Sequence, residues 1–392
     1  MKHQPKVLII GLIDRKKDLQ AQQAGLKEAE LLVDTYGGDV DKVITQNASH
    51  RDSSTYIGSG KVQEIKQLVE AEDINIVVIN DHLKASQLFA LESIISIQSS
   101  CKIWDRTQLI LQIFKKHAST AEAKLQIKLA ELNHHGPELS GLGISMSQQA
   151  GGIGTRGVGE TNTEIMRRHW QKEKKTVKSK LEKVAQNRHQ QMKHRKQSGI
   201  PTVSIIGYTN AGKTTLFNAI SSKKDKVRDA LFATLDSSVS SMYLKHVGKQ
   251  IFISDTIGFI QDLPTMLIDA FKSTLLETIN ADILLHVIDS SDENVHLKIN
   301  TVNQIIESIG LESKQQIYVF NKTDKLSKTK RGELLKKYHK NKHIFISAKN
   351  NQGVDKLVDV IETELLSIGL KRSKHLSYLD NLLSKRNDGV MS

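Results

Sequence analysis

The sequence contains a single cysteine, Cys101, among its 392 residues. One thiol excludes an internal disulfide framework and a CxxC metal site. We therefore expect Cys101 to be a buried structural thiol rather than a reactive one.

Long hydrophobic runs are absent as well. No stretch approaches the roughly 20 apolar residues that a membrane-spanning helix needs. The apolar run from Val7 to Ile13 is ended by Asp14, and it is too short for a signal-peptide core followed by a cleavage site. We expect a cytoplasmic protein without a membrane span.

Charge, by contrast, is plentiful. Charged residues make up 25% of the chain and hydrophobic residues 38%, which suits a globular protein with a sizeable core. The length predicts two or three domains. The formal net charge of +13 indicates a polyanionic partner, although charge constrains partners rather than fold.

The first segment, residues 1–108, alternates between strand and helix patterns. Val7–Ile10 and Ile76–Ile79 are predicted buried strands, and Leu19–Tyr36 and Lys61–Glu70 are predicted helices. This alternation predicts an N-terminal α/β domain. The residues at 56–61, Tyr-Ile-Gly-Ser-Gly-Lys, are either a structural turn into the second helix or a contact to a nucleic-acid backbone.

The second segment, residues 109–198, has the pattern of a helical hairpin. Apolar residues recur at helical spacing from Arg106 to Leu132, glycines crowd residues 136–159, and a second helical pattern runs from Glu160 to Gln197. Two long helices joined by such a loop predict an antiparallel pair whose apolar stripes form the seam.

The second arm of this hairpin is strongly basic. Between Glu160 and Lys196 there are twelve Lys and Arg but four Glu, so the segment carries +8 of the +13 charges. These charged residues either bind a nucleic-acid backbone or only form a solvated face of the helix. Scarce aromatic residues disfavour base stacking, so structured RNA or duplex is the better fit. The candidate RNA contacts are Arg156, Arg167, Arg168 and Lys172.

The third segment, residues 199–368, opens with a phosphate-binding pattern. Gly207–Thr214 fits G-x-x-x-x-G-K-[ST], after a β-branched strand at Val203–Ile206 and before a helical pattern. Backbone N–H groups of such a loop cradle phosphates at a helix N-terminus. Lys213 would reach the β/γ-phosphates and Thr214 would ligate Mg²⁺. The predicted nucleotide contacts are Gly207, Tyr208, Thr209, Asn210, Ala211, Gly212, Lys213, Thr214 and Thr215.

Two further segments are predicted to respond to the γ-phosphate. Asp255 follows a strand and would hold Mg²⁺ through water, and the Gly258 amide would sense the γ-phosphate. Thr234 could close over Mg²⁺ and the γ-phosphate. The residues predicted here are Phe232, Ala233, Thr234, Leu235, Asp236, Asp255, Thr256, Ile257 and Gly258.

The nucleotide base is predicted to be guanine. Asp324 can accept hydrogen bonds from N1–H and the exocyclic amine of guanine, and adenine would leave this carboxylate unpaired. The predicted base-binding residues are Asn321, Lys322, Thr323 and Asp324, with Ser347, Ala348 and Lys349 after the next strand. A nucleotidase acting on ATP or mixed nucleotides is the interpretation that Asp324 disfavours.

Hydrolysis is predicted to depend on Lys213, Thr234 and Gly258. Phe259 follows Gly258, where many small GTPases carry the glutamine that orients water. We therefore expect slow intrinsic hydrolysis that a partner stimulates. Asn210 either helps to coordinate K⁺ or is only a turn residue.

The chain resembles the HflX family of ribosome-associated GTPases. The resemblance rests on residues 56–61, Asp105-Arg106-Thr107, the glycine-rich residues 151–157, the loop at 207–213 and residues 231–236. In residues 158–166 the chain departs from the family pattern.

What the resemblance implies is an N-terminal α/β domain, a helical hairpin and a C-terminal P-loop GTPase domain with a mostly parallel sheet. The residues that remain, 369–392, are expected to form a short basic tail. The resemblance also implies GTP and GDP as ligands, Mg²⁺, and a 50S ribosomal subunit whose rRNA the hairpin loop touches. Family members can split stalled or stressed 70S ribosomes. The alternative is an RNA-binding or ribosome-assembly checkpoint without splitting activity. A monomer is the default expectation.

Overall fold

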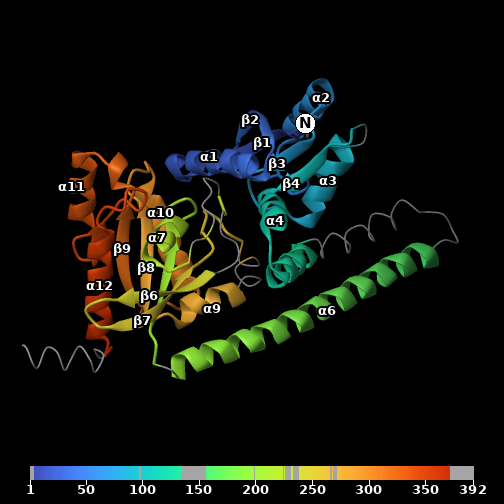
Figure 1. Ribbon diagram of the computed structural model, residues 1–392. Coiled ribbons are helices and arrows are strands. Elements are labelled where there is room, and N and C mark those ends of the chain that lie inside the picture. The colour runs from blue at the N-terminus through green and yellow to red at the C-terminus, as the bar shows by residue number, and fades with distance from the viewer. Residues whose placement is uncertain are drawn as a thin grey trace, which may run out of the picture. The chain divides into compact units, whose positions relative to one another are not determined.

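The computed structural model describes residues 4–96, 99–134, 156–197, 199–223, 225, 231–232, 238–264, 267 and 272–370. The chain divides into two compact units, residues 1–186 with 262–271 and residues 187–261 with 272–392. Figure 1 labels their elements. None of the helices in these ranges is both long and apolar enough to cross a membrane.

The first unit is built on a parallel four-stranded sheet with the order β2-β1-β3-β4. Its strands are β1 (Lys6–Ile13), β2 (Asp39–Asn47), β3 (Ile76–Ile79) and β4 (Lys102–Asp105). Its connecting helices are α1 (Leu19–Tyr36), α2 (Ser59–Glu72), α3 (Ala85–Ile95) and α4 (Arg106–His117). The predicted strands and helices of this segment are confirmed.

Helix α1 has the bounds that the sequence predicts, and its caps explain them. The Asp18 side chain accepts a hydrogen bond from the Gln20 amide at the start. Gly37 ends the helix in the left-handed region at φ 86°, and its N–H donates to the carbonyls of Val33 and Asp34. Both caps satisfy backbone groups that a helix end leaves without partners.

The segment Asp105-Arg106-Thr107 lies at the start of α4 and is buried. Asp105 caps the helix by accepting from the Gln108 amide. The Arg106 guanidinium pairs with Glu28 on α1 and donates to Asn80 after β3. A buried arginine needs such partners, because an unpaired charge in the interior costs several kcal/mol.

The turn at residues 56–61 leads into α2. Tyr56 and Ile57 are buried in the core of the sheet, and Gly58 precedes the first helical residue. The Tyr56 hydroxyl donates to Asp81. These contacts give the turn a structural role, as one of the two interpretations predicts.

The prediction of one helix from Arg106 to Leu132 is wrong. Helix α4 ends at His117, and a second helix occupies residues 121–134. Thr120 starts it, since its hydroxyl accepts from the Ala123 amide at 3.1 Å. Apolar spacing runs through the break, but a threonine oxygen that can cap a new helix interrupts the backbone ladder.

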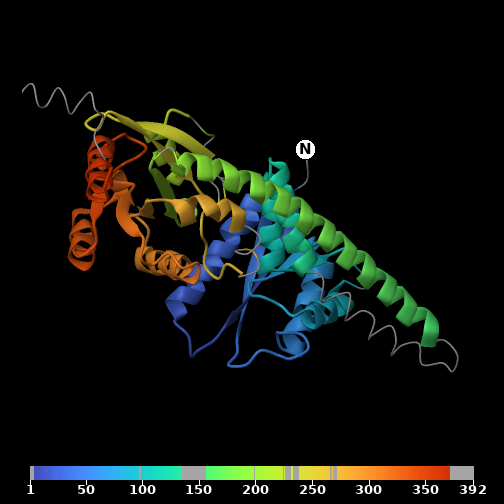
Figure 2. The ribbon, with the colours of Figure 1, turned by 90° about the horizontal axis from the view of Figure 1, so that it is seen from below.

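The second arm of the hairpin is α6 (Arg156–Gln197), 42 residues long. It begins four residues before the predicted start at Glu160, and Figure 2 draws it as one uninterrupted helix. The Trp170 indole N–H donates to the Leu132 carbonyl at 2.9 Å, and Glu173 pairs with Lys128 at 3.1 Å. The later residue on α6 contacts the earlier residue on the helix at 121–134, so the two helices run in opposite directions. The predicted antiparallel pairing is confirmed.

The second unit is built on a six-stranded sheet with the order β10-β9-β8-β5-β7-β6. All neighbours are parallel except β6 and β7. The strands are β5 (Thr202–Gly207), β6 (Ser238–Leu244), β7 (Lys249–Asp255), β8 (Ile283–Asp289), β9 (Gln315–Asn321) and β10 (His343–Phe345). The helices include α7 (Lys213–Ile220), α9 (Lys272–Asn280), α10 (Val295–Ser308), α11 (Lys328–Lys337) and α12 (Val354–Ser367).

The expected fold class, a mixed α/β chain with a mostly parallel C-terminal sheet, is therefore confirmed. The four strands β5, β7, β8 and β9 are buried on both faces over most of their length. Such strands are typical of parallel sheets that helices cover on both sides. Cys101 is 5% exposed and unpaired, and burial raises the pKa of its thiol to about 11, as expected for a structural thiol.

Candidate functional site

The predicted nucleotide residues gather at one edge of the second sheet. Gly207 ends β5, Asp255 ends β7 and Asn321 ends β9. Strand β5 lies between β7 and β8 in the sheet. Ligands of open α/β sheets bind outside the carboxyl ends of the strands, and the predicted residues lie at these ends.

Two glycines give the loop after β5 its shape. Gly207 has φ +148°, and a Cβ there would lie 2.3 Å from the Val287 carbonyl oxygen. Gly212 has φ +91°, and a Cβ would lie 2.3 Å from the Asn321 side-chain nitrogen. Only glycine fits either position, because both the backbone angle and the space exclude a side chain.

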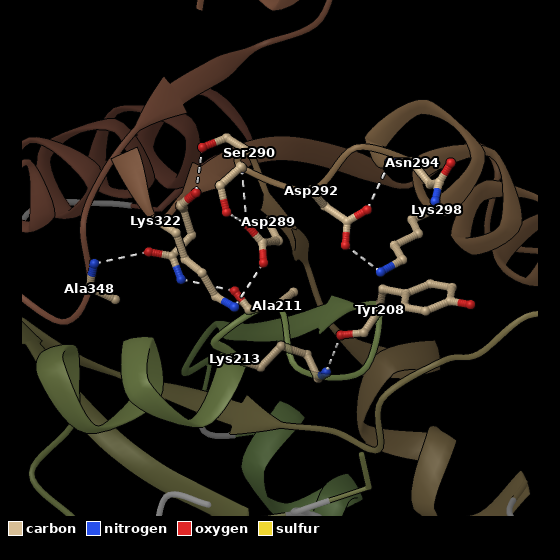
Figure 3. Close-up of polar contacts among 12 residues, drawn as sticks. Tyr208, Ala211, Lys213, Asp289, Ser290, Asp292, Asn294, Lys298, Lys322 and Ala348 are labelled. Carbon is tan, nitrogen blue, oxygen red and sulfur yellow. Dashed lines mark hydrogen bonds and ion pairs between the residues drawn. The ribbon is translucent and has the colours of Figure 1, made fainter. Parts of the chain in front are cut away.

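Lys213 is the first residue of α7 and is 6% exposed. Its ammonium donates to the Tyr208 carbonyl at 2.8 Å, so the side chain folds back over its own loop (Figure 3). Burial lowers the pKa of Lys213 to about 8, and the negative charge of Asp255 opposes this shift only in part. A bound polyphosphate would supply the negative charge that favours the ammonium form.

Thr214 and Asp255 meet beside this lysine. The Thr214 hydroxyl donates to Asp255 at 2.7 Å, and both residues are buried. Hydroxyl and carboxylate oxygens are hard donors of the kind that Mg²⁺ prefers. The pair therefore fits the cation that a GTPase needs.

The segment after Asp255 lies against the loop at 207–215, which is called the phosphate loop below. The Phe259 amide donates to the Gly207 carbonyl at 3.1 Å, and the Thr209 amide donates to the Phe259 carbonyl at 2.8 Å. A Cβ on Gly258 would lie 2.9 Å from the Lys213 ammonium. Phe259 itself is 1% exposed, so its ring belongs to the core of this unit.

The base end of the site is organised by Asn321. Its amide nitrogen donates to the Ala211 carbonyl at 2.9 Å, and its amide oxygen accepts from the Ala348 N–H at 2.9 Å. One side chain thus joins the phosphate loop to the segment after β10. Because Asn321 is 3% exposed, its orientation is fixed by these bonds.

Asp324 lies at the surface near this junction. One carboxylate oxygen accepts from the Ser347 hydroxyl at 2.5 Å, and this hydrogen bond lowers the pKa of Asp324 below its ordinary value. An ionised, oriented carboxylate is the acceptor that the N1–H and amine of guanine require.

Two residues of this region, Asp289 and Ser290, were not predicted from the sequence. The Lys322 ammonium pairs with Asp289 at 2.8 Å, and Ser290 donates to the Asn321 carbonyl at 2.6 Å (Figure 3). Burial opposes ionisation of Asp289, but the bonds from Lys322 and Ser291 outweigh it and keep its pKa low. The available signal was their position at the end of β8, the neighbour of β9.

Other predicted residues lie partly or wholly outside the described ranges. Residues 233–237, with Thr234, fall outside them, while Phe232 is 2% exposed with φ 55°. The glycine-rich residues at 135–155 and the tail from 371 also fall outside.

The candidate RNA contacts lie on α6. Arg167, Arg168 and Lys172 are exposed, and Arg168 pairs with Glu164 at 2.5 Å one turn away. Arg156 is the first residue of α6, and its side chain lies outside the described set.

Three family models match successive parts of the chain. They are described as GTP-binding GTPase N-terminal over residues 23–115, GTP-binding GTPase Middle Region over 117–195, and 50S ribosome-binding GTPase over 202–322. A solved structure described as the SsGBP and GDP complex is 24% identical with a TM-score of 0.52. It covers 94% of this chain and all of its own, and it supports the fold alone.

Curated relatives are more similar in sequence. The GTPase HflX of Caldanaerobacter subterraneus subsp. tengcongensis is 40% identical over 95% of this chain and 83% of its own. That of Alkalihalophilus pseudofirmus is 41% identical over 81% and 74%. That of Escherichia coli is 37% identical over 92% and 82%. With such identities over most of its length and a complete guanine-nucleotide sequence pattern, this chain is a GTP-binding and GTP-hydrolysing protein that belongs to the HflX GTPase family.

Proposed function

We propose that this chain is a GTP-dependent factor that binds the large (50S) ribosomal subunit through rRNA and separates stalled or stressed 70S ribosomes. The observation that carries the proposal is a GTPase unit in the same chain as a 42-residue helix bearing +9 of the +13 net charge. The match to a model described as 50S ribosome-binding GTPase supports the same partner. Exposed basic side chains on a helix suit phosphate contacts, because these need charge and no base reading.

In the proposed site the loop at 207–215 holds the phosphates of GTP. Backbone N–H groups at the start of α7 would donate to the phosphates, and Lys213 would exchange its bond to Tyr208 for the β/γ-phosphates. Thr214, Asp255 and Thr234 would hold Mg²⁺. When bound, this ion neutralises the charge that develops on the transferred phosphoryl group.

Base selection is proposed for the other end of the site. Asp324 accepts from the two guanine donors, while Asn321 keeps the phosphate loop and the 347–349 segment in register. Ala348 N–H already donates to Asn321, so we propose that a neighbouring amide of that segment reaches guanine O6.

Hydrolysis is proposed to be slow until a partner completes the site. The side chain at 259, which follows Gly258, is a buried phenyl ring. It cannot orient water, so the ribosome either supplies the missing group or rearranges the segment.

The γ-phosphate is proposed to act as the switch. The Gly258 amide and Thr234 engage it, and its loss releases both segments. The backbone hydrogen bonds of Phe259 to Gly207 and Thr209 connect the phosphate loop directly to the 255–259 segment.

We also propose that the protein is a cytoplasmic monomer. K⁺ is proposed as a second cation, bound beside Asn210.

The proposal is tested by sedimentation of purified 70S ribosomes with the protein and a non-hydrolysable GTP analogue. We expect the 70S peak to fall, the 50S and 30S peaks to rise, and the protein to travel with 50S. GDP in place of the analogue is the control, and it should leave the 70S peak intact.

The alternative function, an RNA-binding assembly checkpoint, predicts another outcome of the same run. An intact 70S peak with the protein in the 50S or 70S fractions would favour the checkpoint. Absence of the protein from every ribosomal fraction would contradict ribosome binding altogether.

A further inference from the structure

Three potential metal ligands converge in the N-terminal unit, away from the nucleotide residues in sequence. His82 follows β3, Asp105 ends β4 and caps α4, and His134 is the last described residue of the helix that contains residues 121–134. One ligand atom from each lies within 4.8 Å of the other two.

The distances between the histidine nitrogens and the carboxylate oxygens are close to those between neighbouring ligand atoms around a bound metal ion. His82 Nδ1 lies 3.4 Å from one Asp105 oxygen, and His134 Nε2 lies 3.2 Å from the other. A tetrahedral zinc with ligands at about 2.0–2.2 Å has ligand–ligand edges of about 3.3–3.5 Å. A small movement of the side chains would bring one atom from each residue to these distances.

Burial and charge favour a cation here. The side chains of Asp105 and His134 are 0% and 5% exposed, whereas that of His82 is 62% exposed. Asp105 therefore supplies a buried carboxylate ligand, and the exposed His82 lies on the side that solvent can reach.

The carboxylate is also held in place by the backbone. The amide of Gln108 donates to one oxygen at 2.7 Å and that of Leu83 to the other at 3.3 Å. Such outer bonds orient a ligating carboxylate and leave lone pairs for a metal. Thr107 adds a hydroxyl 3.2 Å from His82 Nδ1.

We propose that His82, Asp105 and His134 form a binding site for one Zn²⁺ ion. Two imidazoles and one carboxylate are a ligand set for zinc, whereas Ca²⁺ and Mg²⁺ take oxygen ligands. Three protein ligands leave a fourth position for water or an outside ligand. The ion would join His134 on the helix at 121–134, the first arm of the hairpin, to the segments that follow β3 and β4. It would thereby hold this part of the helix against the sheet. Zinc binding at this site does not depend on the proposed ribosomal function.

The experiment measures zinc affinity of the full chain by competition with a chromogenic chelator after metal removal. Because the chain has 15 histidines, weak surface binding is the background. We expect one tight site per chain, at least tenfold weaker in His82→Ala and in His134→Phe, and unchanged in His50→Ala. His50 is an exposed histidine of the same unit and serves as the matched control.

A second readout separates metal loss from misfolding. His82 is exposed, so His82→Ala should keep the metal-free Tm of the wild type. Zinc should raise the Tm of the wild type and not that of His82→Ala, since a ligand stabilises only a fold that binds it. Absence of a tight site, or equal affinity in wild type, His82→Ala and His134→Phe, would overturn the proposal and leave a hydrogen-bonded His–Asp–His cluster.

Discussion

Single side chains of the second unit connect segments that are far apart in sequence. Asn321 bonds to Ala211 and to Ala348, and Lys322 bonds to Asp289. Each of these contacts lies at the carboxyl ends of parallel strands, where loops that are distant along the chain meet. The proposed base and phosphate contacts therefore depend on the same few polar residues.

Asp324→Ala is expected to remove the preference for guanine. The ratio of GTP to ATP affinity should fall by about 10- to 100-fold, because the hydrogen bonds to the base are worth about 1–3 kcal/mol. Competition binding with both nucleotides measures this ratio. Asp355→Asn, an exposed carboxylate on α12, is the control and should keep it. Unchanged selectivity in Asp324→Ala would remove the base-reading role.

Lys213 should leave a pH signature on the stability of the nucleotide-free protein. Its pKa is about 8 in the fold against an ordinary value of 10.5, so the unfolded chain binds more protons between these values. Stability due to this residue therefore rises as pH increases from 8 to 10.5, by up to about 3 kcal/mol. Urea unfolding of wild type and Lys213→Met at both pH values measures the difference. Parallel changes in the two proteins would contradict the shift.

Among the secondary-structure elements, the helix at 121–134 owes its start to Thr120. Its hydroxyl accepts from the Ala123 amide, and Thr120→Ala should lower the free energy of unfolding by about 0.5–2 kcal/mol. Thr176→Ala is the matched control, because that hydroxyl donates back to Lys172 inside α6 and contributes little. Equal losses in both variants would rule out the cap.

The exposed arginine and lysine of α6 should account for part of the salt dependence of RNA binding. Arg167→Gln with Lys172→Gln should weaken binding to 50S and reduce the slope of log K against log salt by about 1 for each phosphate that the substituted side chains no longer neutralise. Lys336→Gln with Lys340→Gln, in the GTPase unit, is the control of equal charge. A slope that falls equally in both double variants would make the effect one of net charge.

Sequence patterns predicted the elements with strong apolar character and missed those without it. The predicted Leu19–Tyr36 and Ile76–Ile79 are the observed α1 and β3. Strands β2 and β6 were not predicted, because edge strands expose many side chains and lack a continuous apolar run. The break at residues 118–120 was missed because apolar spacing continues across it.

The proposed nucleotide residues could be identified in the sequence because the chemistry of phosphate binding fixes both residue type and spacing. Glycine at 207 and 212 is required by backbone geometry, and threonine and aspartate at 214 and 255 meet as a donor–acceptor pair. Asp289 and Ser290 were missed, because their position at the end of a strand became informative only once β8 and β9 were known to be neighbours. The His82–Asp105–His134 cluster was missed for the same reason.

In the molecule as a whole, GTP hydrolysis is proposed to be coupled to ribosome binding. With a buried Phe259 after Gly258, the basal rate should be low and should rise by at least tenfold when 50S subunits are added. Phosphate release with and without subunits measures this ratio. A fast basal rate with no stimulation would contradict the assignment of the missing group to a partner.

The nucleotide state is proposed to set the affinity of the chain for the large subunit. Equilibrium binding to purified 50S at one fixed salt concentration, with a non-hydrolysable GTP analogue or with GDP, measures this dependence. A coupling typical of switches predicts that the analogue tightens binding by about 5- to 150-fold. Equal Kd values in the two states would rule out this coupling, because hydrolysis could then not release the protein.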